Sequence, residues 1–337
     1  MRHWGKRCLI GLALALSACG HTVSPGPEDR PKSDIAVSPI SRCMNFGSAL
    51  EAPFEGDWGV TIERDDLVRL KQAGFDTVRL PVRWSAHTAL TPPYAIAPDL
   101  LDRVEEIVGW AQALELNIIV NVHHYDALNE DPDTHEPRFL AIWDQLAQRF
   151  LNAPDTLIFE TLNEPHTKMD QARTDILNQR VLSRLRRDHP ERWVILGTAL
   201  WGNLEALGDS RPDYDPRVMV TYHDYSPFAF THQGTSWTDQ KETGIGWGSK
   251  TDRADMAARL DQVVDIQDRL GLPVFVGEFG VYQEVPMAQR AAWTRALRTG
   301  LEARDIAWCY WDYAGSLKAY DKPAGQWLPP IKAALLD

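Results

Sequence analysis

Eight times along its 337 residues, the chain alternates a short apolar run with a segment of helical periodicity. Several of the runs are continuous stretches of Val, Ile and Leu, which is typical of parallel strands buried on both faces. The eight runs are Ser41–Phe46, Thr77–Val82, Asn117–His123, Leu157–Leu162, Trp193–Gly197, Val218–His223, Pro273–Gly277 and Ile306–Trp311. Eight β/α units over about 300 residues predict a single (β/α)8 TIM barrel of the α/β class.

The segments between the runs support this topology. Val104, Val108 and Ala111 share one helical face, for example, whereas residues 201–209 form the weakest of the predicted helices. The competing fold is an open doubly wound sheet, which needs a glycine-rich phosphate turn after its first strand. The sequence there, Asn45-Phe46-Gly47-Ser48-Ala49-Leu50, lacks that pattern, so we expect one barrel and no second domain.

The first residues have the features of an export signal. A basic start and a short apolar stretch at residues 8–15, too short to span a bilayer, lead into Leu16-Ser17-Ala18-Cys19. These four residues resemble the bacterial lipobox, so we expect residues 1–18 to be a signal peptide and Cys19 to carry the lipid anchor. Gly20 favours the outer membrane as the destination. The alternative is an ordinary secretory signal that contains a cysteine.

Residues 19–38 are rich in proline and have no apolar period, which predicts a flexible tether ahead of a barrel at residues 39–337. The barrel holds Cys43 and Cys309. Export permits a disulfide between them, but two buried free thiols are the favoured interpretation. The net charge of −12 excludes a typical nucleic-acid binder, and we expect a monomer.

Polar residues follow six of the eight apolar runs, at the strand ends where barrels of this type carry their catalytic groups. Such groups are costly to bury without a function. The six segments are Arg79–Trp84, His123–Asp126, Asn163–Pro165, His223–Tyr225, Gly277–Gly280 and Trp311–Asp312. Two of the residues are carboxylates, Glu164 and Glu278, and a carboxyl pair across a cleft suits glycoside hydrolysis.

The motifs around these carboxylates resemble those of glycoside hydrolase family 5, the retaining family of endoglucanases and mannanases. Thr161-Leu162-Asn163-Glu164-Pro165 is similar to the acid/base signature, and Val276-Gly277-Glu278-Phe279-Gly280 to that of the nucleophile. The resemblance extends over residues 39–337. The loop Ser226–Gly234 and the segment Ala49–Pro53 resemble the endoglucanase-like branch, although Ser48 stands where that branch often has Asn.

The resemblance implies a role for each group. Glu164 would be the general acid and then the general base, with a pKa raised by the charge of Glu278. Glu278 would be the nucleophile, kept ionised by Arg79 and Tyr225. His223 would act on the acid/base side.

A proline and two glycines next to the carboxylates lead to predictions about the backbone. Pro165 should hold Glu164 in an extended conformation, because a residue before proline avoids the helical region. Gly277 and Gly280 should leave room for close substrate approach.

Other residues are expected to bind sugar. Asn163 would bind the 2-OH, His123 would line the −1 subsite and Trp311 would be its stacking floor. His124 is either a substrate contact or a core histidine, and Glu51 is a further expected sugar contact. Among the 13 Trp, three loop residues are the candidates for outer subsites, namely Trp201, Trp237 and Trp247.

These features predict a retaining endo-acting hydrolase of β-1,4-linked glucans, with polysaccharide as its partner and no cofactor or metal. Mannan, glucomannan and xyloglucan are alternative substrates. A non-catalytic polysaccharide-binding barrel is an alternative from another class, but both carboxylates are present. A metal-dependent hydrolase would use His123, His124 and His223, yet it usually shows His-x-His on its first strand, which Ser41–Phe46 lacks.

Overall fold

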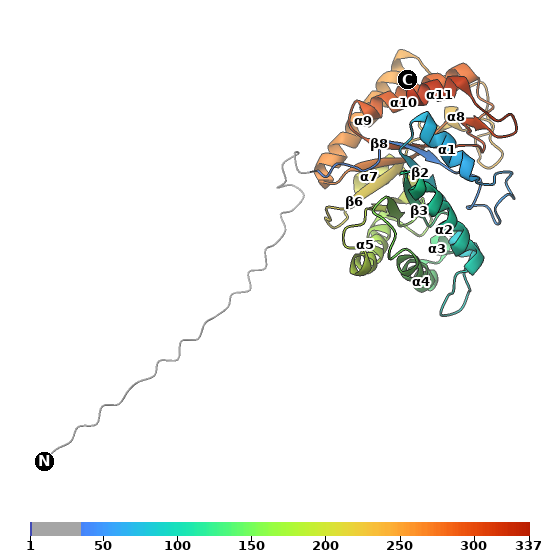
Figure 1. Cartoon of the computed structure of the whole chain (residues 1–337). Coiled ribbons are helices and arrows are strands. Elements are labelled where there is room, and N and C mark those ends of the chain that lie inside the picture. Colours follow the sequence, from blue (N-terminus) through green and yellow to red (C-terminus); the bar gives the residue numbers. More distant parts are fainter. Residues whose placement is uncertain (2–34) are drawn as a thin grey trace.

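Eight parallel strands close into a barrel in a computed structural model that describes Met1 and residues 35–337. Each strand pairs with the next, and the eighth pairs with the first. The strands lie inside a layer of helices (Figure 1). The strands are β1 (Arg42–Asn45), β2 (Thr77–Leu80), β3 (Asn117–Asn121), β4 (Leu157–Glu160), β5 (Val194–Leu196), β6 (Val218–His223), β7 (Val274–Phe279) and β8 (Ala307–Tyr310). The predicted (β/α)8 barrel is confirmed, with each strand inside or within two residues of its predicted run.

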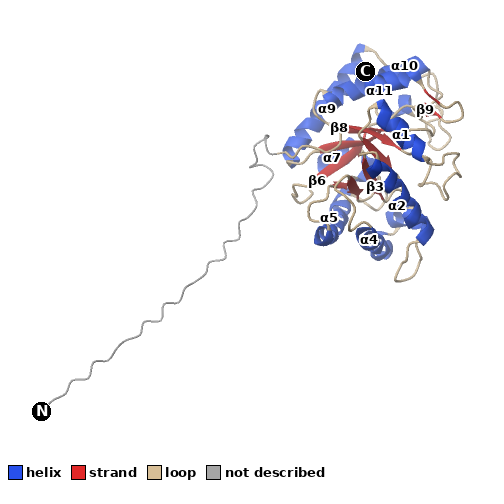
Figure 2. Ribbon diagram, in the orientation of Figure 1, coloured by secondary structure: helices blue, strands red, loops and turns tan. Residues whose placement is uncertain are grey.

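Helices surround the barrel on the outside (Figure 2). They are α1 (Arg64–Ala73), the 3-10 helix η3 (Trp84–His87), α2 (Pro98–Ala113), α3 (Asp126–Glu130), α4 (Pro132–Arg149), α5 (Gln171–Asp188), α6 (Ala199–Gly202), α7 (Leu204–Asp209), α8 (Phe228–Thr231), α9 (Lys250–Leu270), α10 (Met287–Glu302) and α11 (Pro329–Leu336). A small hairpin of β9 (Tyr320–Asp321) and β10 (Gln326–Trp327) precedes α11. After β5 only the short α6 and α7 form, as the weak apolar period predicted.

Two apolar clusters hold the fold together, and they follow the alternation of side chains along a strand. The larger cluster lies between the strands and the helices and includes Val78, Val120 and Trp143. The smaller cluster is formed by the alternate residues of the strands, such as Ile119 and Ile158, and it fills the floor of the barrel. Above that floor, polar residues occupy the same alternate positions, which places charge inside the barrel near its carboxyl-terminal mouth.

A disulfide joins Cys43 on β1 to Cys309 on β8, so the expectation of two free thiols is wrong. The two cysteines are 266 residues apart in sequence. Barrel closure nevertheless puts them directly opposite each other in the β1–β8 register, and both are fully buried. Because the two cysteines are so far apart in the sequence, the sequence alone did not indicate that they pair.

We expect the double substitution Cys43→Ala/Cys309→Ala to lower the free energy of unfolding by about 3–5 kcal/mol, because the bond closes a very long loop in the unfolded chain. Guanidinium unfolding of the oxidised protein and of the double variant measures the difference. Treatment of both proteins with reductant is the control and should act on the wild type alone. Equal unfolding midpoints before reduction would contradict the prediction.

The predicted signal peptide and lipidation site, and most of the predicted tether, lie outside the described residues, which begin again at residue 35. Within the described part of the chain, no helix combines the length and apolar character that crossing a bilayer requires.

Candidate active site

Arg79 organises the mouth of the barrel from the carboxyl end of β2. Its fully buried guanidinium donates two hydrogen bonds of 2.6 Å to Glu160 on β4 and one of 2.7 Å to Oε1 of Glu278 on β7. It also donates to Oδ1 of Asn163 at 2.7 Å and to Oδ1 of Asn45 at 2.9 Å. One buried cation therefore orients four groups that lie on three strands, β1, β4 and β7, or just after them.

Glu160 is a residue that our sequence reasoning missed. It lies at the end of β4, it is fully buried, and Arg79 binds both of its carboxylate oxygens. A charge inside the apolar run Leu157–Leu162 was the available signal, because a buried carboxylate requires a partner.

Glu278 lies near the end of β7 with two hydrogen-bond donors on its carboxylate. Arg79 donates to Oε1, and the hydroxyl of Tyr225 donates to Oε2 at 2.9 Å. Burial raises the pKa of Glu278, and the positive charges of His223 and Arg79 oppose that effect. Both donors favour the ionised carboxylate that a nucleophile needs.

Glu164 forms a hydrogen bond with His223, and the neighbouring Glu278 does not keep it protonated. Nδ1 of His223 lies 2.7 Å from Oε1 of Glu164 and 3.6 Å from Oε2 of Glu278. Burial favours a raised pKa for Glu164, but the hydrogen bond and charge of His223 outweigh it, and the pKa of Glu164 is lowered. Burial likewise disfavours charge on His223, yet Glu278 and Glu164 raise its pKa.

The expectation that Glu278 would raise the pKa of Glu164 is therefore wrong, because His223 lies closer to Glu164. One proton is held in the short hydrogen bond between His223 and Glu164.

The two carboxylates are close together. Ligand-type oxygen atoms of Glu164 and Glu278 and a ring nitrogen of His223 all lie within 4.8 Å of one another. Retaining glycosidases have carboxyl groups roughly 5–5.5 Å apart, whereas inverting enzymes need about 6.5–9.5 Å to admit a water molecule. The arrangement has the spacing for double displacement.

The backbone at Glu164 differs from our expectation. Its φ is 45°, in the left-handed region, so the prediction that Pro165 would hold it extended is wrong. The strand already ends at Glu160, and Glu164 lies in the loop that follows. A non-glycine residue held in this region is strained, which is common where a catalytic group must be aimed.

The two glycines beside Glu278 serve strand packing, not substrate approach. A Cβ at Gly277 would lie 2.6 Å from Oγ1 of Thr221 and 3.0 Å from Nε2 of His223, and one at Gly280 would overlap the carbonyl oxygen of Trp311. Protein atoms therefore fill the space that we expected to be open.

His123 and Trp311 form one wall of the site. Their rings are parallel within 4° at a centroid distance of 5.5 Å. Burial and the positive charges of nearby groups lower the pKa of His123 well below its usual range, so it is neutral. The ring of His124 meets His123 edge-on at 4.6 Å and Trp58 at 6.2 Å, and it is only half-buried, so it is not a core histidine. Trp58 is exposed and was missed by our sequence reasoning.

The three candidate outer-subsite tryptophans divide into two groups. Trp201 is 57% exposed and stacks on His166 at 4.9 Å, and its amide donates to the carbonyl of Pro165. Trp237 is 52% exposed and packs edge-on against Tyr282.

Trp247 belongs to the core, so its prediction as a sugar platform is wrong. It is 9% exposed and packs near Phe230, with Arg253 over its ring. The loop location suggested exposure, but the helices α8 and α9 enclose the side chain.

The prediction that Glu51 contacts sugar is also wrong. It is fully buried, and its carboxylate accepts hydrogen bonds from the amides of Ser48 and Ala49. The carboxylate is turned into its own loop and not toward the open cleft.

We expect Trp201→Ala to raise KM on a long β-glucan about tenfold with little change in kcat, because an exposed stacking face is worth roughly 1 kcal/mol or more. Its melting temperature should match the wild type. Trp247→Ala is the matched control and should lower the free energy of unfolding by about 3–5 kcal/mol. Steady-state kinetics and thermal unfolding separate the two effects. Equal effects of both variants on KM would contradict this division.

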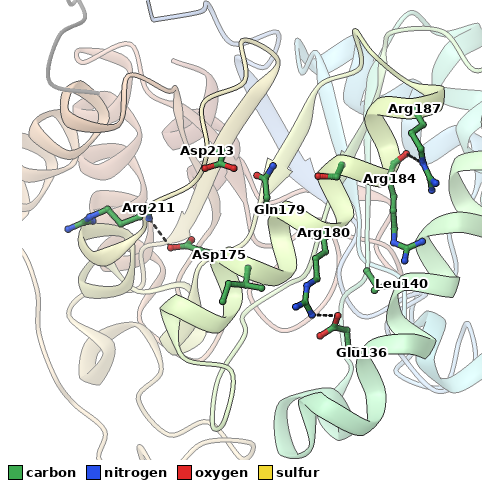
Figure 3. A pocket seen from close by; sticks show the side chains of 11 residues that line it. Glu136, Leu140, Asp175, Gln179, Arg180, Arg184, Arg187, Arg211 and Asp213 are labelled. Atoms are coloured by element: carbon green, nitrogen blue, oxygen red, sulfur yellow. Dashed lines mark hydrogen bonds and ion pairs between the residues drawn. The ribbon is translucent and has the colours of Figure 1, made fainter. Parts of the chain in front are cut away.

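An outer groove of about 820 Å³ lies between α4, α5 and the loop before β6, away from the catalytic pair (Figure 3). Two pairs of polar groups lie within its lining. Arg180 binds Glu136, and the amide of Arg211 donates to Asp175 at 2.8 Å. The groove flanks the helical layer, so we do not assign it to the reaction.

Comparison with known proteins identifies similar sequences. A family model described as "Cellulase (glycosyl hydrolase family 5)" matches residues 42–316. The "Endoglucanase H" of Acetivibrio thermocellus is 35% identical over 295 residues, which is 86% of this chain and 31% of that protein. The chain spans about a third of the length of the first curated relatives that it matches.

Solved structures match over nearly the whole barrel. Cel5A of Thermotoga maritima in complex with mannotriose has a TM-score of 0.87 at 35% identity, covering 91% of this chain and 100% of that one. The same protein in complex with cellobiose has a TM-score of 0.87 at 36% identity, with the same coverage.

Proposed function

Because the chain belongs to glycosyl hydrolase family 5, we propose that its barrel is a retaining endo-β-1,4-glucanase acting on cellulose-type or mixed-linkage glucans. The observation that carries the proposal is the close approach of Glu164 and Glu278, each with its own hydrogen-bond partners. That pairing assigns different tasks to two chemically identical side chains.

In the first step, a carboxylate oxygen of Glu278 attacks the anomeric carbon and the bond from that carbon to the glycosidic oxygen breaks. The departing oxygen takes, through Glu164, the proton that Glu164 and His223 share in their hydrogen bond of 2.7 Å. Arg79 and Tyr225 donate hydrogen bonds that aim Glu278 and favour its ionised form, against the burial that raises its pKa.

In the second step, water attacks the same carbon from the leaving-group side. Glu164, now a carboxylate, takes a proton from the water while the bond to Glu278 breaks.

The −1 sugar is bound by other residues of the mouth. Oδ1 of Asn163 accepts a hydrogen bond from Arg79, so the NH2 group of Asn163 is left to bind the 2-OH of the sugar. Neutral His123 and the ring of Trp311 would bound the −1 sugar.

Mannan and glucomannan are the second substrate class. The support is that Thermotoga maritima Cel5A, at 35% identity, was solved with mannotriose as well as with cellobiose. Xyloglucan is a further alternative on the same scaffold.

A hydrolysis panel tests the proposal. The full chain is assayed on carboxymethylcellulose, barley glucan, xyloglucan and mannan, with a fall in viscosity ahead of reducing-end release as the mark of endo cleavage. Glu278→Ala from the same preparation controls for contaminating enzymes. We expect the highest rate on a β-1,4-containing glucan. Mannan cleaved faster than every glucan would overturn the first choice, and activity on none would overturn the proposal.

We also propose that the enzyme is an exported bacterial lipoprotein, anchored through Cys19 to the outer membrane. The lipobox-like sequence supports this, and so does the disulfide between Cys43 and Cys309, because such bonds persist in oxidising compartments. Cys19→Ala should remove palmitate labelling and release the protein from the membrane fraction. Equal labelling of Cys19→Ala would overturn the anchor, and an unlabelled but exported wild type would indicate an ordinary secretory signal.

A further inference from the structure

The loop after β4 joins the acid/base residue to an exposed tryptophan. Glu164 and His166 lie on this loop, and Trp201 lies in α6, directly after β5. The side chain of His166 contacts both of the other residues, yet the double displacement does not use it.

The ring of His166 makes two contacts of different kinds. Its Nδ1 lies 2.8 Å from the backbone carbonyl oxygen of Glu164. A carbonyl oxygen only accepts, so Nδ1 carries a proton and donates this hydrogen bond. The face of the same ring stacks on the indole of Trp201, with the planes 11° apart and the centroids 4.9 Å apart. One side chain therefore ties the backbone of the acid/base residue to an aromatic ring that is 57% exposed.

The backbone on both sides of this contact lies in the left-handed region. On the loop after β4, φ is 45° at Glu164 and 56° at Thr167. In α6, φ is 52° at Leu200 and 56° at Trp201. Residues other than glycine are strained in this region and stay there only where surrounding contacts hold them. The hydrogen bond from His166 is such a contact, because its acceptor belongs to the strained Glu164 itself.

The loops after β4 and β5 also meet through their backbones. The amide of Trp201 donates to the carbonyl of Pro165 at 3.3 Å. A Cβ at Gly202 would lie 3.4 Å from Cγ of His223, whose ring is bound to the carboxylate of Glu164. The turn that carries Trp201 therefore lies against both a backbone neighbour and the side-chain partner of Glu164.

The loop after β4 is also anchored without the His166 ring. Oδ1 of the buried Asn129 on α3 accepts a hydrogen bond from the amide of His166 at 3.2 Å, and its carbonyl accepts one from the amide of Lys168 at 3.1 Å. The amide of Met169 donates to the carbonyl of His166 at 2.9 Å. These bonds use the backbone of His166, so a substitution there changes the ring contacts and leaves the loop attached to α3.

We propose that His166 is a positioning residue with two separable effects. Its Nδ1 fixes the backbone that aims Glu164, and its ring supports Trp201 beneath the sugar on the leaving-group side. The inference rests on the proposed function, in which Glu164 protonates the oxygen of that sugar. A misplaced proton donor slows the chemical step, whereas a loosened stacking ring weakens substrate binding. The two contacts should therefore separate in kcat and KM.

Two substitutions of His166 each keep one contact. His166→Phe keeps a ring to stack on Trp201 and removes the donor, so kcat on a long β-glucan should fall about tenfold with KM within about twofold of the wild type. His166→Asn keeps an NH2 donor and removes the ring, so KM should rise about fivefold with little change in kcat. His135→Phe is the matched control. It replaces a half-buried histidine on α4 whose Nδ1 lies 3.2 Å from the hydroxyl of Tyr125, and it should match the wild type.

The leaving group distinguishes a role in protonation from a general distortion of the site. A dinitrophenolate departs without a proton, so kcat/KM of His166→Phe on dinitrophenyl β-cellobioside should equal the wild-type value, while kcat/KM on cellotetraose falls about tenfold. Equal losses on both substrates would overturn the positioning role, and so would an unchanged kcat on the glucan.

A double variant tests the second effect. KM of His166→Asn/Trp201→Ala should be no higher than KM of Trp201→Ala alone, because the ring that His166 supports is already gone. Increases in KM that multiply in the double variant would overturn the support of Trp201, and so would an unchanged KM in His166→Asn.

A measurement on the wild type keeps the test independent of substrate. Nuclear magnetic resonance of protein with isotope-labelled histidine should show a proton on Nδ1 of His166, assigned by the loss of its signals in His166→Asn. Trp201→Ala should shift the ring protons of His166, because the indole stacks on them. An unprotonated Nδ1, or ring protons unaffected by Trp201→Ala, would overturn the inference even in an active enzyme. Failure on every glycan with both signals present would instead reject the proposed function alone.

Discussion

Glu278→Ala is expected to lower kcat on its best glucan by about 10⁴- to 10⁶-fold while the affinity for that glucan changes little. The substitution removes the atom that forms the bond to the anomeric carbon, and uncatalysed attack by water cannot replace it. The hydrogen-bond donors Arg79 and Tyr225 remain and still shape the cleft. Steady-state kinetics gives the loss in turnover, and affinity electrophoresis in a gel containing the polysaccharide gives the binding.

Two further measurements on Glu278→Ala distinguish a nucleophile from a structural residue. Azide fits the space left by the carboxylate, so it should restore turnover of an activated aryl glycoside and give a glycosyl azide of inverted configuration. Glu284→Ala, at an exposed position beyond β7, is the control and should behave as wild type. Full activity of Glu278→Ala would refute the mechanism. Binding by a wild type that never turns over would favour the non-catalytic barrel.

Arg79→Met is expected to lower the free energy of unfolding by about 3–5 kcal/mol and to abolish measurable activity. The guanidinium is fully buried and binds Glu160 and Glu278 together. Without it, two buried carboxylates lose their common cation, which costs more than the loss of the hydrogen bonds alone. Denaturant unfolding measures the change in stability.

Two variants make the Arg79 result specific. Arg79→Met/Glu160→Met removes the cation together with one buried charge and should recover part of the stability without recovering activity. Arg149→Met breaks ion pairs with Asp102 and Glu105 on the surface and should cost less than about 1 kcal/mol. If Arg79→Met unfolds at the wild-type denaturant concentration, the network around Arg79 does not carry the stability that we assign to it.

The barrel could be predicted from the sequence because its rules are local. A strand buried on both faces must be apolar throughout, and a connecting helix must repeat its apolar residues every three to four positions. The strand pattern is present in the runs around Val120 and Val220, and the helical pattern is present at Val104, Val108 and Ala111. The disulfide could not be predicted, because it depends on which residues face each other when β8 closes onto β1.

The candidate site was predictable for a related reason. Parallel strands end on one side of the barrel, so charged residues after apolar runs must share its mouth. This reasoning identified Glu164, Glu278, Arg79 and His223, which the structure brings together. It missed Glu160, whose charge lies inside a run.

The sequence by itself determined the class of fold, the side of the barrel that carries the site and the two carboxylates on it. Apolar periodicity and strand ends depend only on residues that are close together in the sequence. Only the tertiary structure decided how each group behaves there. Burial placed Trp247 and Glu51 out of reach of substrate, and the position of His223 lowered the pKa of Glu164 instead of raising it. Burial and proton sharing depend on distances between strands, which no local pattern records.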